Sequence, residues 1–465
     1  MGRMWHLQVW TTTSKPRRDT SPMQHTVNAS LLVCLSEKGF SLDELVWRLR
    51  ELFERKAHGE ILRTILMLVE EVLKLKVMRK AEVPIACDCG HADFVLNGRQ
   101  KSRRIRTSLG DVGLSALARV KCGRCGRTHT LLLKFLGVER HQSKTTELER
   151  QAIEEAVADS YRRAAGRLGQ ATGNRTPPST LHGWVLDTRA DEIDLPPDVL
   201  GALPATVFAD GTKYKGAGGV RGDIKALIGI TATGEFVPLG TWTGGQSWKQ
   251  VAADLDRRSV RFPAGTVLVA DAEAGLAEWL ADHADLHQRC QWHTVRDLYH
   301  AMWKDGGAIG EIRPVQDALK VVMGIELPKE DFEQVPESEK DGIEARMEKA
   351  ETQVSELVRH LAGRGFHKAA HYLDRSRRYL FSYVRRWLQF GIACPRASSL
   401  IERFFRELGR RIKKLGYNWK PAGVGKITRI LLKKCTRPED WKKYWEDRMR
   451  LDGSVQVLFR ILQAS

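Results

Sequence analysis

The chain has 465 residues, of which 42% are hydrophobic, and a formal net charge of +18 at pH 7. This length and apolar content predict a folded protein of about two to four domains with a sizeable core. The charge favours a polyanionic partner, most simply nucleic acid; the alternative is a protein that is basic without such a partner. No apolar run approaches the roughly 20 residues of a membrane span, so no membrane association is expected.

The first 82 residues contain no predicted catalytic group. Residues 1–40 are expected to be disordered, with Met23 as an alternative start. They lack an apolar core followed by a small-residue cleavage site, so no secretory signal is predicted and a cytoplasmic location is expected. Residues 41–82 predict a helical pair, because apolar residues recur at helical spacing after a capping box at Ser41 and Glu44. This pair is assigned to packing or dimerisation.

Close pairs of cysteines predict a metal site. In a chain expected to be cytosolic, such pairs favour metal binding over disulfides, with buried free cysteines as the alternative. Cys122 and Cys125 belong to a CxxCG knuckle, whereas Cys87, Cys89 and His91 form an irregular CxC segment. Tetrahedral zinc needs four ligands. The knuckle supplies two of them, and two of the other three residues supply the rest.

The segment between the cysteine pairs is rich in arginine. It predicts hairpin strands carrying Arg103, Arg104 and Arg106, so residues 83–140 are interpreted as a zinc-ribbon-like basic β module with a structural zinc ion. Such a hairpin suits contacts to DNA phosphates, and a solvated charged face has the same pattern.

Residues 141–190 predict a helix-turn-helix, a DNA-binding element. One helix carries Tyr161 and Leu168, a Gly/Asn turn follows, and a second helix opens at Pro177 to enter the major groove. A helical hairpin without DNA-binding function would have a similar pattern. Residues 191–204 are interpreted as a linker. The basic residues that support DNA binding are Arg162, Arg163, Arg167 and Arg175.

Residues 205–300 predict the first part of a catalytic core. Three hairpin-like strands are followed by βα units, which indicates an α/β domain with a mixed sheet in a multidomain α+β chain. Asp210 and Asp271 each end a short apolar run, so each carboxylate is expected at the edge of this sheet. The order of the strands resembles an RNase H-like nuclease fold.

A third acidic residue, Glu402, opens a basic helix in the last segment, residues 395–465. Too many residues separate it from Asp271 for a simple loop, so residues 301–394 are interpreted as an all-helical insertion. Carboxylates held on neighbouring strands and a helix can bridge two Mg²⁺ or Mn²⁺ ions for phosphoryl transfer.

Each of these assignments has a competing interpretation. Asp210 can cap the turn at Gly211, and Asp271 can cap the helix that follows it. Trp242 and Trp248 can stack on a flipped base, although core packing is favoured for both. Five other acidic residues are alternatives to the three carboxylates: Asp223, Asp254, Asp256, Glu273 and Glu407.

The region Thr206–Lys434 resembles the Mutator-like DDE transposases of prokaryotic insertion sequences. The matching segments are ADGTKYK, VLVADAEAGL, RCQWH, DLYHAMWKDG and SSLIERFFRELGRRIK. The resemblance implies an RNase H-like sheet with helices on both faces and a helical insertion. It implies that the metal-binding catalytic residues are Asp210, Asp271 and Glu402. It also implies that Cys290 and His293 are accessory core residues.

The expected function is therefore DNA transposition. The N-terminal modules would bind the terminal inverted repeats of double-stranded DNA, and a homodimer or higher oligomer would pair two ends. The alternatives are an RNase H-like nuclease without strand transfer and a transposase-derived DNA-binding protein. Cations on and after the Glu402 helix are expected to contact phosphates: Arg403, Arg406, Arg410, Arg411, Lys413 and Lys414.

Overall fold

The computed structural model describes most of the chain, as two compact units. The first unit ends with Tyr161–Trp184, and the second runs on from Val185. The predicted first helix and N-terminal disorder, and nearly all of the predicted linker, lie outside the described residues. No described helix has both the length and the apolar character needed to cross a bilayer. The described residues are 58–193, 206–219, 221–231, 233–273, 275–280, 283–284, 286–415 and 419–451.

The first unit contains two small sheets packed against a long helix. Helix α2 (His58–Met78) buries Leu73 and Val77 in a core that it shares with the strands. Strands β1, β4 and β5 form an antiparallel sheet, and β2 and β3 form the arginine-rich hairpin that the sequence predicts. The bounds are β1 (Phe94–Arg99), β2 (Arg103–Thr107), β3 (Gly110–Leu114), β4 (Ala118–Cys122), β5 (Thr128–Thr130) and α3 (Leu131–Phe135).

Three helices follow these sheets, and two of them form the predicted helical hairpin. Helix α5 (Tyr161–Thr172) ends at Gly173, whose φ of 70° suits the left-handed backbone of a helix C-terminus. Helix α6 (Pro178–Asp187) begins with a proline, a residue favoured in the first helical turn. Helix α4 (Thr146–Ala158) precedes them. DNA binding by this hairpin remains a prediction.

The second unit is built on a five-stranded mixed sheet in the order β10-β9-β6-β7-β8. β6, β7 and β8 pair antiparallel, whereas β9 and β10 lie parallel to β6 on its other side. The mixed sheet predicted from the sequence is therefore present. The bounds are β6 (Thr206–Lys215), β7 (Arg221–Ile230), β8 (Phe236–Thr243), β9 (Val267–Ala270) and β10 (Leu286–Arg289).

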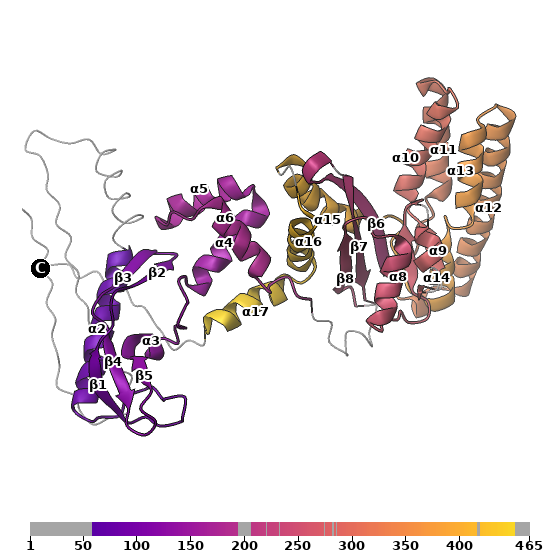
Figure 1. Cartoon of the computed structure of the whole chain (residues 1–465). Helices are drawn as coiled ribbons and strands as arrows, with labels where there is room; N and C mark the ends of the chain where they lie inside the picture. The colour runs from indigo at the N-terminus through magenta and orange to yellow at the C-terminus, as the bar shows by residue number, and fades with distance from the viewer. Residues whose placement is uncertain are drawn as a thin grey trace, which may run out of the picture. The chain divides into compact units, whose positions relative to one another are not determined.

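Helices cover both faces of this sheet (Figure 1). Helices α8 (Trp248–Arg257) and α9 (Leu276–Leu280) share a core with the strand residues of one face. Helices α15 (Ser399–Gly409) and α16 (Pro421–Thr436) pack on the strands from the other side. The coverage explains why β9 consists only of buried apolar residues, since a strand covered on both faces needs no polar side.

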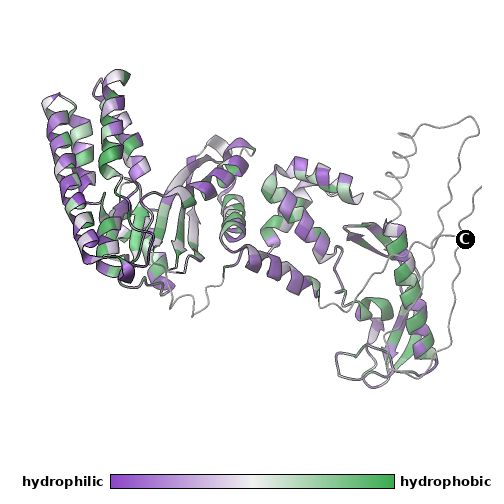
Figure 2. Ribbon diagram, turned by 180° about the vertical axis from the view of Figure 1, so that it is seen from behind, coloured by the Kyte–Doolittle hydropathy of each residue, from purple (hydrophilic) through white to green (hydrophobic). Residues whose placement is uncertain are grey.

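A group of helices separates β10 from α15 in the chain. Figure 1 shows the longer of these helices side by side beyond the β10 end of the sheet, and Figure 2 shows polar residues along their outer surface. The first of them starts before residue 301, the predicted insertion boundary. The bounds are α10 (Gln291–Lys304), α11 (Ile309–Met323), α12 (Glu337–Gly363), α13 (His367–Arg377) and α14 (Ser382–Phe390).

A buried ion pair fastens the start of the second unit to α16. The carboxylate of Asp191, 4% exposed, lies 2.7 Å from Lys426 Nζ and 2.7 Å from Arg429 Nε. Asp191→Ala is expected to lower the free energy of unfolding by about 3 kcal/mol, because it leaves the largely buried Lys426, whose side chain is 13% exposed, without its partner. Urea denaturation measures the loss.

The control for this prediction is Asp440→Ala. Asp440 also pairs with an arginine, Arg437, at 2.7 Å, but its side chain is half exposed. Its loss is expected to cost less than about 1 kcal/mol. Equal effects of the two substitutions would contradict the structural role assigned to Asp191.

Candidate active site and metal centres

Asp210 and Asp271 lie side by side on neighbouring strands. The parallel pairing of β6 with β9 ends at Ala209 and Ala270, and each aspartate is the next residue. The prediction that Asp210 ends its strand was wrong, because β6 continues to Lys215 by pairing with β7. Asp210 is nevertheless the first residue of β6 beyond the short β9, so from Asp210 onward β6 pairs only with β7.

The alternation of side chains along β6 decides which face carries Asp210. Val207 and Ala209 belong to the core beneath α8, so Phe208 and Asp210 point to the opposite face. That face is covered by α15, which contacts β6 and carries Glu402 in its first turn. The fold thus brings all three predicted carboxylates to one region.

Each aspartate uses one carboxylate oxygen in a local turn. Asp210 Oδ1 accepts from the Gly211 N–H at 2.7 Å, and Asp271 Oδ1 accepts from the Glu273 N–H at 2.8 Å. The capping interpretation is therefore correct for one oxygen of each residue, although Asp271 caps a turn rather than a helix. Within the described part of the chain, the second oxygen of each residue has no hydrogen-bond partner.

Burial and the neighbouring charge of Asp271 raise the pKa of Asp210 to about 7. Two carboxylates whose negative charges repel in this way form a donor set that suits a divalent cation. Glycine at position 211 leaves room for the Glu273 side chain, since a Cβ there would lie 2.9 Å from the carboxylate oxygen Oε2 of Glu273. Glu273 therefore lies beside β6 one residue beyond Asp210, although the described residues hold no group of three carboxylates within reach of one ion.

Glu402 contacts His293 rather than the two aspartates. Its Oε1 lies 3.7 Å from His293 Nε2 and 3.3 Å from Ser398 Oγ. Among the described residues, Glu402 forms a ligand group with Cys290 and His293, and no group within reach of one ion joins it to Asp210 and Asp271. His293, rather than Glu402, interacts electrostatically with Asp210, because its charge opposes the upward shift of the Asp210 pKa.

Cys290 and His293 are coupled inside the core. Burial by itself would raise the pKa of Cys290, but hydrogen bonds from His293 and Ser398 lower it. Burial likewise opposes charge on His293, yet the hydrogen bond and charge of Cys290 raise the pKa of His293. The pair predicted as accessory core residues therefore has a polarised thiol and imidazole.

A pocket of about 380 Å³ opens beside Asp271. Its acidic lining includes Asp297, which the sequence analysis missed although it lies one turn beyond His293 on α10. The alternative residues Asp223 and Glu273 also line it, and Asp223 is bound to Lys225 at 2.5 Å. Elsewhere the remaining alternatives have cationic partners: Asp254 pairs with Arg257 and Arg258, Asp256 with Arg261, and Glu407 with Arg410.

A second pocket, of about 540 Å³, begins at the residue after Cys290. Trp292 is 54% exposed on its wall, and the Arg296 guanidinium lies 5.3 Å from the centre of the indole ring. Trp242 and Trp248 are buried in the core, as favoured for both. Trp292, inside the CQWH motif, is therefore an exposed aromatic side chain on the wall of this pocket. Other polar residues of this pocket are Tyr299, His300, Gln316, Lys320 and Arg396.

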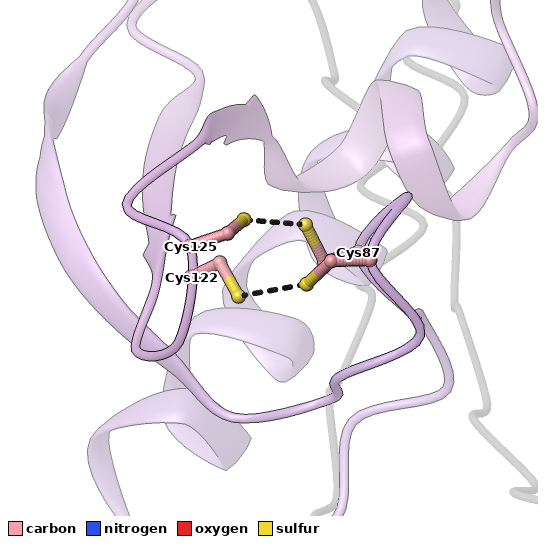
Figure 3. A group of neighbouring side chains, drawn as sticks. Cys87, Cys122 and Cys125 are labelled. Carbon is pink, nitrogen blue, oxygen red and sulfur yellow. Dashed lines mark hydrogen bonds between the residues drawn. The ribbon is translucent and has the colours of Figure 1, made fainter.

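The four cysteines of the first unit form one cluster. Cys87 Sγ lies 3.4 Å from Cys125 Sγ (Figure 3), and Cys89 Sγ lies 3.7 Å from Cys122 Sγ. Sulfur atoms on a tetrahedral zinc ion, with bonds of about 2.3 Å, lie about 3.8 Å apart. The cluster therefore fits a structural zinc ion.

The irregular CxC segment is a shortened version of the regular knuckle. In the regular loop, Gly126 N–H donates to the Cys122 carbonyl and Cys122 N–H to that of Arg127. In the short loop, the Gly90 N–H donates to the Cys87 carbonyl, and the Cys87 N–H donates to the carbonyl of His91.

His91 therefore closes the short loop with its backbone. Its side chain is exposed, with Nδ1 3.2 Å from Arg124 instead of in the cluster. This removes it from the ligand set that the sequence left open. A different histidine, His129, lies beside the cluster, with Nε2 3.2 Å from Cys87 Sγ.

The predicted DNA-contacting arginines of the first unit differ in their surroundings. Arg103 binds backbone carbonyls in residues 139–142, and Arg167 pairs with Glu155 at 2.5 Å. Arg162 and Arg163 are exposed. The remaining three, Arg104, Arg106 and Arg175, line a pocket of about 490 Å³. There Arg104 also pairs with Asp111, and the Arg106 guanidinium lies over the Trp184 ring.

One predicted phosphate contact in the second unit is wrong. Arg411 is only 2% exposed, and its guanidinium lies 4.7 Å from the centre of the Trp419 ring. It lies beside the buried Ile412 in a short π-helix (Arg410–Lys414), on the side of that helix that packs in the core. The other predicted contacts are exposed: Arg403, Arg406, Arg410, Lys413 and Lys414.

No protein-family model matches this chain, and no well-characterised protein matches its sequence.

Proposed function

We propose that this chain is a metal-dependent DNA transposase of the DDE type, similar to the Mutator-like group. The observation that carries the proposal is the pairing of Asp210 with Asp271 across β6 and β9, on the face covered by the helix of Glu402. The raised pKa of Asp210 supports it, because burial and the negative charge of Asp271 disfavour the charged form of this carboxyl.

The strand order also supports the proposal. An RNase H-like core requires an antiparallel hairpin set followed by parallel strands on the opposite side of the first strand, with catalytic carboxylates on the first and fourth. The order β8-β7-β6-β9-β10 is compatible with that arrangement. The helices α11 to α14, lying between β10 and α15 in the chain, correspond to the expected insertion.

The proposed metal ions fit the donor set of Asp210 and Asp271, and Glu402 is the third proposed ligand. When bound, two Mg²⁺ or Mn²⁺ ions supply the charge that phosphoryl transfer needs at the attacking and leaving oxygens. The chain's own residues hold the substrate. Exposed cations such as Arg403 and Arg406 on the helix of Glu402 bind the phosphate backbone, which fixes its register without reading its sequence.

The first unit is proposed to bind the transposon ends. Its contribution combines the four-cysteine zinc-ribbon-like module, the hairpin of α5 and α6, and the pocket of Arg104, Arg106 and Arg175. Synapsis of two ends requires at least a homodimer.

The test uses the full chain with duplexes amplified from the DNA that flanks its gene on each side. With Mg²⁺ or Mn²⁺ and a supercoiled target plasmid, the proposal predicts nicking at the element ends and covalently joined products. Cleavage without joining would indicate the nuclease alternative. Specific binding without cleavage in either metal would indicate a DNA-binding protein and contradict the proposal.

Trp292 is predicted to stack on a DNA base. Trp292→Ala is expected to weaken binding of a single-stranded oligonucleotide by about 1–3 kcal/mol, because base stacking on an aromatic side chain contributes about that much. Fluorescence anisotropy at fixed salt measures the change. The matched control is Trp303→Ala, since Trp303 lies on the same helix, is 64% exposed and does not line the pocket. Equal losses in both variants would contradict the assignment.

A further inference from the structure

Glu402 lies beside a thiol and an imidazole, which are ligands that magnesium does not prefer. The candidate ligand atoms of Cys290, His293 and Glu402 all lie within 4.8 Å of one another. Thiolate and imidazole select zinc and other borderline or soft metals, whereas magnesium takes oxygen ligands. This donor set therefore differs in chemistry from the carboxylates of Asp210 and Asp271.

We propose that Cys290, His293 and Glu402 form a second zinc site, separate from the four-cysteine cluster. Three protein ligands leave the fourth tetrahedral position for water, as in zinc sites that remain accessible. Cys290 and His293 are buried and the Glu402 side chain is 30% exposed, so the open position lies on the side of Glu402. Binding of zinc here does not depend on the proposed DNA chemistry.

The distance between the His293 and Glu402 ligand atoms is close to the one that zinc requires. Nitrogen and oxygen ligands on a tetrahedral zinc ion, with bonds of about 2.0–2.2 Å, lie about 3.4 Å apart. His293 Nε2 and Glu402 Oε1 are 3.7 Å apart, so a few tenths of an ångström close the gap. Cys290 immediately precedes α10 and His293 lies in its first turn. Contacts of Cys290 with Ser398 and of His293 with Glu402 bring both next to the first turn of α15.

Ser398 supplies the hydrogen bonds that such a site needs around its ligands. Its N–H and its hydroxyl each lie 3.3 Å from Cys290 Sγ, where they donate to the sulfur and favour the thiolate. Its Oγ also lies 3.4 Å from His293 Nδ1. A proton on Nδ1, donated to this oxygen, leaves the Nε2 lone pair directed toward Glu402.

Zinc in this site would join the helix that follows β10 to the helix that follows the insertion. It would also occupy the carboxylate of Glu402. If the proposed function is correct, zinc and magnesium therefore compete for that residue.

The test measures bound zinc rather than activity. Full-length protein is reloaded with zinc, dialysed against metal-free buffer and analysed for zinc per chain by mass spectrometry. Wild-type protein is expected to hold two zinc ions per chain, whereas Cys290→Ser and Glu402→Gln each hold one. The matched control is Cys435→Ser, which removes an exposed cysteine on α16 and is expected to hold two.

Two results would overturn the second zinc site. One is a single zinc ion per wild-type chain, and the other is two zinc ions in both substituted proteins. Glu402→Gln changes a partly exposed side chain, so it remains informative if Cys290→Ser disrupts the buried core. Circular dichroism of each variant verifies that the protein measured is folded.

Discussion

Replacing Asp271 by asparagine is expected to reduce metal-dependent strand cleavage and joining by at least about a thousandfold. The amide keeps the size of the side chain but removes the charge that, with Asp210, would hold the metal ions. Loss of about 4 kcal/mol of transition-state stabilisation corresponds to three factors of ten in rate. A gel assay of radiolabelled DNA ends measures cleavage, and anisotropy of the same duplex is expected to show unchanged binding.

The control for this substitution is Asp256→Asn. Asp256 also lies in the second unit, but it belongs to α8 and pairs with Arg261 and His283. Its substitution is expected to leave cleavage within about twofold of wild type, since ordinary surface changes have small effects. Cleavage that survives in Asp271→Asn, or that is lost equally in both variants, would exclude Asp271 from the metal site.

Replacing Cys122 by serine is expected to remove one zinc ion per chain and to destabilise the first unit by several kcal/mol. In small zinc domains, metal binding and folding are one equilibrium, with apparent binding free energies of about 10–16 kcal/mol. The effect here is expected to be smaller, because α2 and the strands have an apolar core of their own. Zinc analysis and thermal unfolding of the variant measure the two effects.

His91→Ala distinguishes a zinc site of four cysteines from one in which His91 replaces a cysteine, a choice that the sequence left open. The structure predicts that this variant keeps its zinc, since His91 closes the short loop through its carbonyl and its imidazole lies by Arg124. Loss of zinc on His91→Ala would show that the histidine is a ligand. Retention of zinc in Cys122→Ser would exclude the four-cysteine site altogether.

The strands of the second unit could be predicted because their apolar runs are local signals. The run before Asp271 is bounded by glycine and the aspartate, and β9 occupies nearly the same residues. The run before Asp210 gave a strand that was too short. Antiparallel pairing with β7 extends β6 through polar residues to Lys215, and a pairing partner elsewhere in the chain is not visible in a local pattern.

The partners of individual charged residues could not be predicted. Arg411 and Arg410 are adjacent in one basic run, yet one packs over Trp419 in the core and the other is exposed and pairs with Glu407. Likewise, the indole ring of Trp242 is buried in the core, whereas that of Trp292 is exposed. Burial depends on which segments meet, so composition and spacing do not distinguish these cases.

The sequence by itself determined the residue types, the mixed sheet with its apolar strands, and the cysteines available for zinc. These follow from side-chain periodicity and from ligand chemistry, which act over a few residues. Only the tertiary structure decided that Asp210 lies beside Asp271, that His91 leaves the zinc cluster, and that Glu402 meets Cys290 and His293. Each depends on contacts between segments distant in the chain, set by strand pairing and by the packing of helices on the sheet.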